Sequence, residues 1–485
     1  MSPVLATLVY TSGIAVLFFL DRDNSIQTSK ALWLPVIYLW ILGSRPISVW
    51  FGIVPAQGTD IQLEGSPIDA VFFGVLLIAA IVVLIQRGRK TIILLNGNLP
   101  ILMYFSFCLL TVIWSDFPGV AIKRWIKALG DLAMILIVVT DEHPLAALRR
   151  LFSRTSFILL PISLLLIKYY PSLGRSYDIW SGAQFATGAT LDKNMLGVIT
   201  FVLLLGATWR ALGLFRLEEA GSHRFRHLLA QVILLAIGVS LLVDANSVTS
   251  SVSFSLGVGL LLATGLRIIR RNPSTVHVLV LLLVVVAISI KFFGVGARAA
   301  EALGRNATLT GRTDIWAAVI PMVPHPLVGA GFESFWLSPS VRRTLTDMFQ
   351  GLPLNEAHDG YIEVYLNLGV IGLGLLGLIL IDGYRRAVKA FRYQPALGGL
   401  LLAYVLAAIT YSITEAGFRM MHPNWIFLLL AVTEAGWVVT RTSRSVDASP
   451  DCPPELTPGR PLEARTNRRR MIGQYDVARD KLPLL

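Results

Sequence analysis

The stretch PVLATLVYTSGIAVLFFL, residues 3–20, runs for 18 residues without a charged side chain. A helix needs roughly 20 mostly apolar residues to cross the hydrocarbon core of a bilayer, or somewhat fewer when its ends reach the headgroups. Backbone amides cannot stay unpaired in lipid, so an apolar run of this length is typical of a helical span. The stretch therefore predicts the first helix of an all-α integral membrane protein.

Similar runs recur along the whole chain of 485 residues, of which 54% are hydrophobic and only 15% charged. A soluble domain usually carries about 25% charged residues, so this composition excludes water-soluble, disordered and collagen-like classes. We expect a polytopic bundle of about 12–13 transmembrane helices over residues 1–440. The candidate spans begin near Pro3, Ala31, Asp69, Asn98, Trp125, Ser156, Asn194, Leu228, Ser251, Ser274, Tyr361, Pro395 and Asn424.

The net charge of +12 is concentrated in short basic clusters between these runs, at 87–90, 149–154, 267–271 and 385–392. Lys and Arg near span ends stay in the cytoplasm, so the clusters predict topology and not nucleic-acid binding. By parity, the tail at 441–485 is predicted to be cytoplasmic and, being rich in Pro and Arg, disordered. With only two cysteines, Cys108 and Cys452, the chain offers neither a disulfide framework nor a cysteine metal site.

The alternate loops, predicted to face outward, contain the less usual sequence. The segment 294–360 is far longer than a connection requires and is dense in polar, aromatic and glycine residues. We expect it to form the functional head. Lys123, Arg124 and Lys127 also fall on this outer side, against the positive-inside tendency, which indicates an anionic partner or an interfacial helix.

Several familiar motifs are excluded. The GLGLLG stretch at 372–377 fits the dinucleotide-binding spacing, but it lies in an apolar run without a preceding strand, so close helix packing explains it better. The sequence has no Gly-Lys dipeptide for a Walker loop and no His-Glu-x-x-His zinc pair. We therefore expect neither ATP nor a metal ion as cofactor.

Three outer motifs follow one another: LGRNATLTGRTDIW at 303–316, PLVGAG at 326–331 and EAHDGYIE at 356–363. Ten residues separate His358 from Gly369, and DKNMLG at 192–197 opens a span. Over residues 114–425 this order resembles the O-antigen ligase and polymerase superfamily, especially its exopolysaccharide-polymerase branch. One departure is Asp359, where Asn commonly follows the histidine, which leaves His358 in place but adds an acidic neighbour.

The resemblance implies an inverting transfer of glycan from a polyprenyl diphosphate to an acceptor hydroxyl, at the periplasmic face of the bacterial inner membrane. The acceptor is a growing glycan for a polymerase or lipid A core for a ligase, and the GRTDIW and AHDGYIEVY stretches look more like the polymerase branch. Membrane lipids and other polysaccharide-assembly proteins are the further expected partners, and nucleic acid is not. The alternative is a transporter or flippase of lipid-linked oligosaccharides, for which repeat symmetry and midplane polarity are expected.

Glycan transfer from a diphosphate requires stabilisation of the leaving phosphates and removal of a proton from the attacking hydroxyl. Arg312 is predicted to bind the phosphates, because a guanidinium fork matches phosphate oxygens. Capping a helix or pairing with Asp314 is its structural alternative. His358 is predicted to be the base, because an unperturbed imidazole titrates near pH 6.5 and is neutral at working pH.

Further candidates are expected to bind the diphosphate or glycan, or to orient the base. Lys193 and Arg124 are second-rank phosphate ligands, and Asn194 either contacts substrate or marks the start of a span. Glu356 or Asp359 would orient the imidazole. Two other polar groups remain open between substrate contact and packing: the turn at 244–249, and the late cluster of Glu415, Arg419 and His422.

Overall fold

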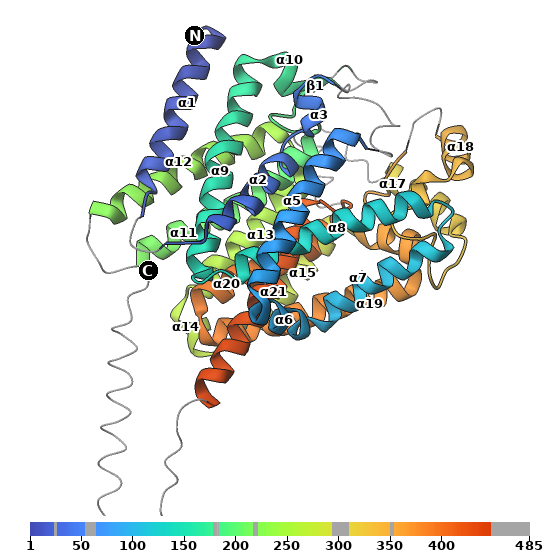
Figure 1. The fold of residues 1–485 in the computed structure, drawn as a ribbon. Coiled ribbons are helices and arrows are strands. Elements are labelled where there is room, and N and C mark those ends of the chain that lie inside the picture. The colour runs from blue at the N-terminus through green and yellow to red at the C-terminus, as the bar shows by residue number, and fades with distance from the viewer. Residues whose placement is uncertain are drawn as a thin grey trace, which may run out of the picture.

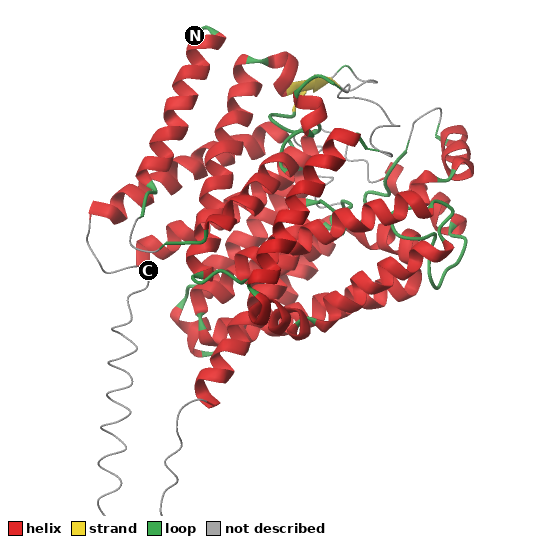
Figure 2. Cartoon of the chain, viewed as in Figure 1, coloured by secondary structure: helices red, strands yellow, loops and turns green. Residues whose placement is uncertain are grey.

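The structure, a computed structural model, describes residues 1–23, 27–53, 65–177, 182, 184–216, 222–292, 310–349 and 354–447. Helices make up nearly all of it, beside one small antiparallel hairpin (Figure 2). The hairpin pairs β1 (Arg175–Tyr177) with β2 (Gln184–Ala186). The predicted all-α membrane protein is confirmed.

The long and medium helices carry the apolar runs, and many of them begin at a proline, whose missing N–H costs nothing at a helix start. They are α1 (Pro3–Leu20), α2 (Trp33–Leu42), α5 (Pro67–Gln86), α6 (Gly88–Gly97), α7 (Leu99–Leu110), α8 (Pro118–Val139), α9 (Pro144–Tyr169), α11 (Lys193–Arg216), α12 (Ser222–Ala245), α13 (Val248–Thr264), α15 (Thr275–Phe292), α19 (Gly360–Tyr393), α20 (Pro395–Tyr411) and α21 (Pro423–Asp447).

Short helical segments connect or cap these. They are η1 (Lys30–Leu32), α3 (Ile47–Trp50), η2 (Thr111–Trp114), α10 (Pro171–Gly174), α14 (Arg267–Arg271), α17 (Thr310–Val319), η3 (Ile320–Met322), η4 (Phe335–Leu337) and α18 (Pro339–Met348).

Among the described residues, seven helices are long and apolar enough to cross a membrane, or eight if the bent pair α6 and α7 with η2 forms one span. This is fewer than the 12–13 predicted spans. Four of the predicted spans are shorter apolar helices, at Lys30–Leu42, Val248–Thr264, Thr275–Ser289 and Pro395–Tyr411. The span predicted from Trp125 is α8, whose first turns carry Lys123, Arg124 and Lys127 as part of the helix instead of a loop.

Burial divides the helices into an inner and an outer set. Helix α21 is almost wholly buried, whereas α1 and α5 expose most of their apolar side chains. Helices α20 and α21 pack against α19, and α11 packs between α12, α13 and α9 (Figure 1). Exposed valines and leucines on the outer helices are expected where the surroundings are lipid. The basic segment 149–154, predicted as a loop, lies within α9.

Helix α19 is broken at Gly369, which has a φ of 63°. The PLVGAG segment lies against the break: the Val370 amide donates to the Pro326 carbonyl at 2.9 Å, and the Gly331 amide donates to the Asn367 carbonyl at 2.9 Å. A Cβ at Gly369 would stand 2.3 Å from the Leu327 carbonyl carbon. Only glycine fits this conformation and contact, which gives a physical reason for the glycine eleven residues after His358.

The predicted outer loop contains ordered helices over residues 310–349. Helices α17 and α18 with η4 form a small apolar core of their own around Ile315, Trp336 and Leu345. In Figure 1 this group lies at one end of the molecule, beyond α7 and α19. The motif residues 303–309 lie outside the described residues. At the other end of the chain, α21 continues to Asp447, past the predicted boundary at 440, and residues 448–485 also lie outside the description.

Candidate functional site

The carboxylate of Glu415 lies at the centre of a polar cluster on the loop between α20 and α21. Arg312, in the first turn of α17, donates from Nη2 to its Oε1 at 3.0 Å. Asn194, in the first turn of α11, donates to its Oε2 at 3.5 Å. The Arg312 guanidinium also donates to the Thr414 carbonyl. Arg312 therefore pairs with Glu415 and not with Asp314, the alternative partner considered from the sequence.

His358 joins the same carboxylate. Its Nδ1 lies 2.9 Å from Oε1 of Glu356 and 3.4 Å from Oε2 of Glu415. The segment 354–359 precedes α19 and carries His358. Through this segment the predicted base and the predicted phosphate ligand, Arg312, contact the same carboxylate, that of Glu415. Of the two predicted orienting residues, Glu356 makes this contact. Asp359 instead accepts hydrogen bonds from the amides of Tyr361 and Ile362 and caps α19.

The two carboxylates change the charge state expected for His358. Burial alone lowers the pKa of the imidazole, but hydrogen bonds to Glu356 and Glu415 outweigh it and raise the pKa to about 10. For Glu356, burial raises the pKa, and the hydrogen bond and charge of His358 reverse this and lower the pKa to about 2. The substrate-free site therefore holds an imidazolium at neutral pH, in contrast to the neutral ring expected from the unperturbed value.

Both backbone groups of Ala357, the residue before His358, are held by side chains. Its amide donates to Oε1 of Glu363, and its carbonyl accepts from Nε1 of Trp316 at 2.8 Å. The other oxygen of Glu363 accepts from Nε1 of Trp336 at 2.9 Å. His358 itself has a φ of 51°. A left-handed conformation costs a residue with a side chain about 1–3 kcal/mol and persists only where its surroundings enforce it. The contacts on Ala357 supply that enforcement.

A second ion-pair group adjoins the first. Arg419 lies 3.4 Å from Oε2 of Glu333 through Nε and 3.6 Å from Oε2 of Glu356 through Nη1. Arg124, on α8, donates to the backbone carbonyl of Glu333. Arg124 is buried inside the protein, not exposed on an outer loop as the sequence suggested. This hydrogen bond ties α8 to the segment that carries Glu333. Glu333, like His358, has a φ of 51°.

The same loop contributes a second histidine. Burial lowers the pKa of His422 to about 4, and its Nδ1 accepts from the Asn424 amide at 3.2 Å. The loop is held by Asp131 of α8, whose carboxylate accepts from the Met421 amide at 2.8 Å and from the Tyr38 hydroxyl at 2.6 Å. His422 is thus neutral where His358 is charged, although both lie near Glu356.

Glu356, His358 and Glu415 place three possible ligand atoms within 4.8 Å of one another, a spacing that a metal ion could use. The carboxylates already face two guanidinium groups, Arg312 at 3.0 Å and Arg419 at 3.6 Å. These positive charges offset the carboxylates and weaken their attraction for a divalent cation. The two guanidinium groups can instead pair with an anionic group of a ligand.

Sequence reasoning identified Arg312, His358, Glu356 and Asn194, and the structure brings these four together. Lys193 lies apart, with Nζ 5.8 Å from the ring centroid of Phe185. The sequence left Glu415, Arg419 and His422 undecided between packing and substrate contact, and the structure places them beside these four in one polar cluster. The signal available for them was the density of charge between two apolar runs.

Comparison with known proteins agrees with the motifs. Residues 232–377 match the family model described as O-antigen ligase. The chain is 27% identical over 314 residues to the exopolysaccharide production protein ExoQ of Rhizobium meliloti (strain 1021), a match that covers 62% of this chain and 68% of that protein. The predicted resemblance to O-antigen ligases is confirmed. The family match includes Arg312, Glu356 and His358, while Asn194 and Glu415 lie outside it.

Proposed function

We propose that this O-antigen ligase-related chain is a membrane glycosyltransferase that moves or polymerises glycan from a polyprenyl-diphosphate-linked donor onto an acceptor hydroxyl. The family and the relative's name support a multi-pass membrane enzyme of surface polysaccharide biosynthesis. The proposal extends this to the periplasmic face of the bacterial inner membrane, to inversion at the anomeric carbon and to catalysis without metal.

The observation that carries the proposal is the shared carboxylate: Arg312 and His358 both contact Glu415. A diphosphate arriving at the site competes with Glu415 for the Arg312 fork, which is then free to stabilise the charge that builds on the leaving group. The acceptor hydroxyl attacks from the side opposite the diphosphate. The new bond joins its oxygen to the anomeric carbon, the bond from that carbon to the phosphate oxygen breaks, and the diphosphate leaves with the electron pair.

His358 receives the proton of the acceptor hydroxyl in this scheme. The carboxylates of Glu356 and Glu415 hold Nδ1, so the proton on that nitrogen stays in place and Nε2 is the nitrogen that accepts. The high pKa makes the ring a strong base but leaves it protonated in most free molecules at neutral pH. Deprotonation of the imidazolium is therefore a required step before each transfer.

The test is reconstitution of the purified protein with an undecaprenyl-diphosphate-linked oligosaccharide, in EDTA and without ATP, followed by mass analysis of lipid and glycan. Longer glycan on the lipid indicates a polymerase, and transfer to added lipid A core indicates a ligase. The variant His358→Asn should be inactive but folded, because asparagine tolerates a positive φ. His325→Asn, at an exposed histidine of the same outer region, is the matched control and should stay active.

If the substrate stays intact and only moves from one leaflet to the other, the protein is a flippase and the proposed enzyme function is wrong. Transfer that requires a divalent cation would contradict the metal-free part of the proposal. Glu356, His358 and Glu415 would then be the residues to test as metal ligands.

A further inference from the structure

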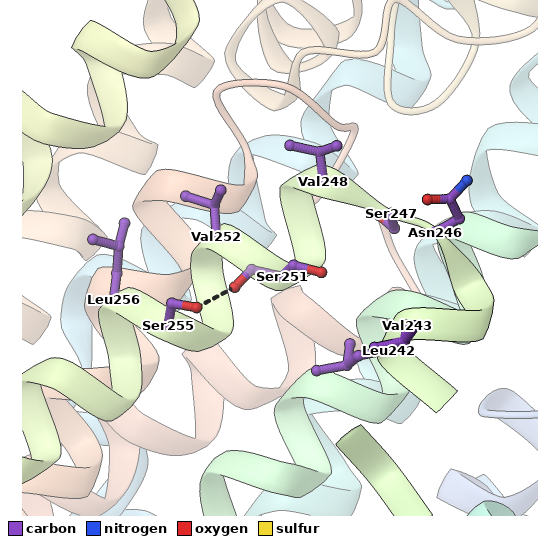
Figure 3. A pocket seen from close by; sticks show the side chains of 9 residues that line it. All are labelled: Leu242, Val243, Asn246, Ser247, Val248, Ser251, Val252, Ser255 and Leu256. Atoms are coloured by element: carbon purple, nitrogen blue, oxygen red, sulfur yellow. Dashed lines mark hydrogen bonds between the residues drawn. The ribbon is translucent and has the colours of Figure 1, made fainter. Parts of the chain in front are cut away.

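A groove lies on the outer half of the α12–α13 hairpin, at some remove from the ion pairs (Figure 3). Its volume is about 450 Å³, within the range of about 300–1,000 Å³ common for ligand pockets. Figure 3 shows Val248, Val252 and Leu256 along one row of α13. Leu242 and Val243 come from the adjoining end of α12.

The lining is mostly apolar, although it includes three serines and Asn246. Ser255 Oγ donates to the Ser251 carbonyl of its own helix at 2.8 Å, and Ser247 Oγ donates to Ser250 Oγ at 3.0 Å. These hydroxyl protons are used within the helix. Among the lining residues, Val243 is 73% exposed and Val248 is 51% exposed. Such a surface suits a hydrocarbon chain and offers little to a sugar.

Two hydrogen bonds connect the end of the groove to the polar cluster. Thr249, next to Val248 in the first turn of α13, shares a hydrogen bond of 2.8 Å between its hydroxyl and that of Thr414. The carbonyl of Thr414 accepts from the Arg312 guanidinium, and the next residue is Glu415. Two contacts therefore lead from the proposed phosphate ligand to the mouth of the groove.

The length of the groove also fits a lipid tail. From Val248 to Leu256 helix α13 advances about 12 Å at about 1.5 Å per residue. The outer half of a hydrocarbon core is about 15 Å thick. A chain whose headgroup sits at Arg312 would run along α13 from Val248 towards Leu256.

We propose that the α12–α13 groove binds the isoprenoid chain of the lipid-linked donor, which rests on the function proposed above. The apolar lining takes the first isoprene units beyond the diphosphate. It thereby fixes the depth and direction in which the anomeric carbon is presented to His358.

A binding test needs no turnover. Wild-type protein in nanodiscs is irradiated with undecaprenyl diphosphate that carries a diazirine in its first isoprene units and no glycan, and the labelled peptides are mapped. Label within residues 242–256 that unlabelled undecaprenyl diphosphate displaces, and phospholipid does not, supports the proposal. Absence of label there overturns it, and so does equal labelling by a diazirine phospholipid, which would make the groove an ordinary lipid contact.

A matched pair of variants tests the consequence for transfer. Val243→Trp fills the groove, and Val278→Trp makes the same change on α15 at a similarly exposed valine, 70% exposed against 73%. Val243→Trp should raise KM for the undecaprenyl-linked donor by about tenfold or more. It should leave KM unchanged for the same glycan on methyl diphosphate, which has no hydrocarbon chain to enter the groove.

If Val243→Trp behaves like Val278→Trp with both donors, the groove proposal is overturned while the proposed function stands. If the wild type transfers glycan from neither donor, the proposed function fails, and the photolabelling result still decides the groove. Ser255→Leu, a smaller change in the same groove, replaces Val243→Trp if that protein does not fold, and should raise KM in the same donor-dependent way.

Discussion

Gly329 and Gly369 interlock backbone against backbone. A Cβ at Gly329 would stand 2.3 Å from the Asn367 carbonyl carbon, and a Cβ at Gly369 would stand 2.3 Å from the Leu327 carbonyl carbon. Both glycines have positive φ, 71° and 63°. The crossing joins the PLVGAG segment to the break in α19, eleven residues beyond His358. It therefore fixes the position of the first turns of α19, which follow the candidate site.

Gly369→Ala should destabilise the protein by at least about 1–3 kcal/mol, because alanine meets both the backbone clash and the unfavourable φ. Gly377→Ala, on the same helix, is the control: a Cβ there meets nothing within 4 Å among the described residues. It should be neutral, or stabilising by about 0.5–1 kcal/mol. Thermal unfolding in detergent, followed by tryptophan fluorescence, measures both. Equal midpoints for the two variants would contradict the crossing.

The pH dependence of turnover should report the charge on His358. A base works in its neutral form, and the raised pKa of His358 leaves it protonated well above neutrality. The kcat/KM should therefore rise with pH through the neutral range and level off near the pKa of about 10. Glu415→Gln removes one of the carboxylates that raise this pKa, so the rise should level off at lower pH. A flat profile from pH 7 to pH 9 would mean that the imidazolium is the working form.

Arg312→Lys keeps the positive charge and loses the planar fork. If the guanidinium binds the diphosphate, kcat/KM should fall by about tenfold or more, since a point charge does not match two phosphate oxygens. Arg343→Lys, at an exposed arginine of α18, controls for the substitution itself. Steady-state rates with the lipid-linked donor decide the matter, and equal kcat/KM in both variants would remove Arg312 from phosphate binding.

Glu363 accepts from two donors, the Ala357 amide and the Trp336 indole, and a glutamine can satisfy only one of them with its single oxygen. Glu363→Gln should therefore release Ala357 and lower the pKa of His358 towards its ordinary value. Carbethoxylation of His358 by diethyl pyrocarbonate, mapped by mass spectrometry across pH, measures this without any substrate. Reactivity of His358 at neutral pH should increase.

Trp336→Phe removes the competing donor, so the double variant Glu363→Gln with Trp336→Phe should recover part of the wild-type reactivity profile. Glu434→Gln, at a buried glutamate on α21, is the matched control and should leave the profile unchanged. A double variant no better than Glu363→Gln alone would show that the carboxylate acts on general stability and not on the position of His358.

The sequence predicted the class of fold and half of the site, for identifiable reasons. An apolar run predicts that a helix forms. Whether that helix is long enough to be a complete span depends on where it ends or bends, and several apolar runs form short or bent helices. His358 and Arg312 stand in motifs with local spacing. Glu415 lies 57 residues beyond His358, on a turn after α20, and only tertiary packing brings the two together. Its sharing between Arg312 and His358 had no sequence signal.

Charge state was the least predictable property. The histidine expected to be neutral is held as a cation by two carboxylates, while His422, a few residues from Arg419, is kept neutral by burial. Both outcomes depend on which side chains the fold places within hydrogen-bond distance. Arg124 illustrates the same point. The sequence predicted it on an outer loop, but α8 begins at Pro118 and therefore includes Arg124, which is buried and donates to the Glu333 carbonyl.

The position of Glu415 also has a consequence during synthesis. A ribosome delivers Arg312 and His358 to the membrane before it delivers Glu415, so the nascent chain passes through a stage in which both side chains lack the carboxylate that they share in the folded protein. A chain that terminates before residue 415 would be left in that stage, with the imidazole at a lower pKa and the guanidinium unpaired. Synthesis as far as Glu415 is thus a condition for assembling this cluster, and products truncated before it should lack the proposed activity even if their earlier helices insert normally.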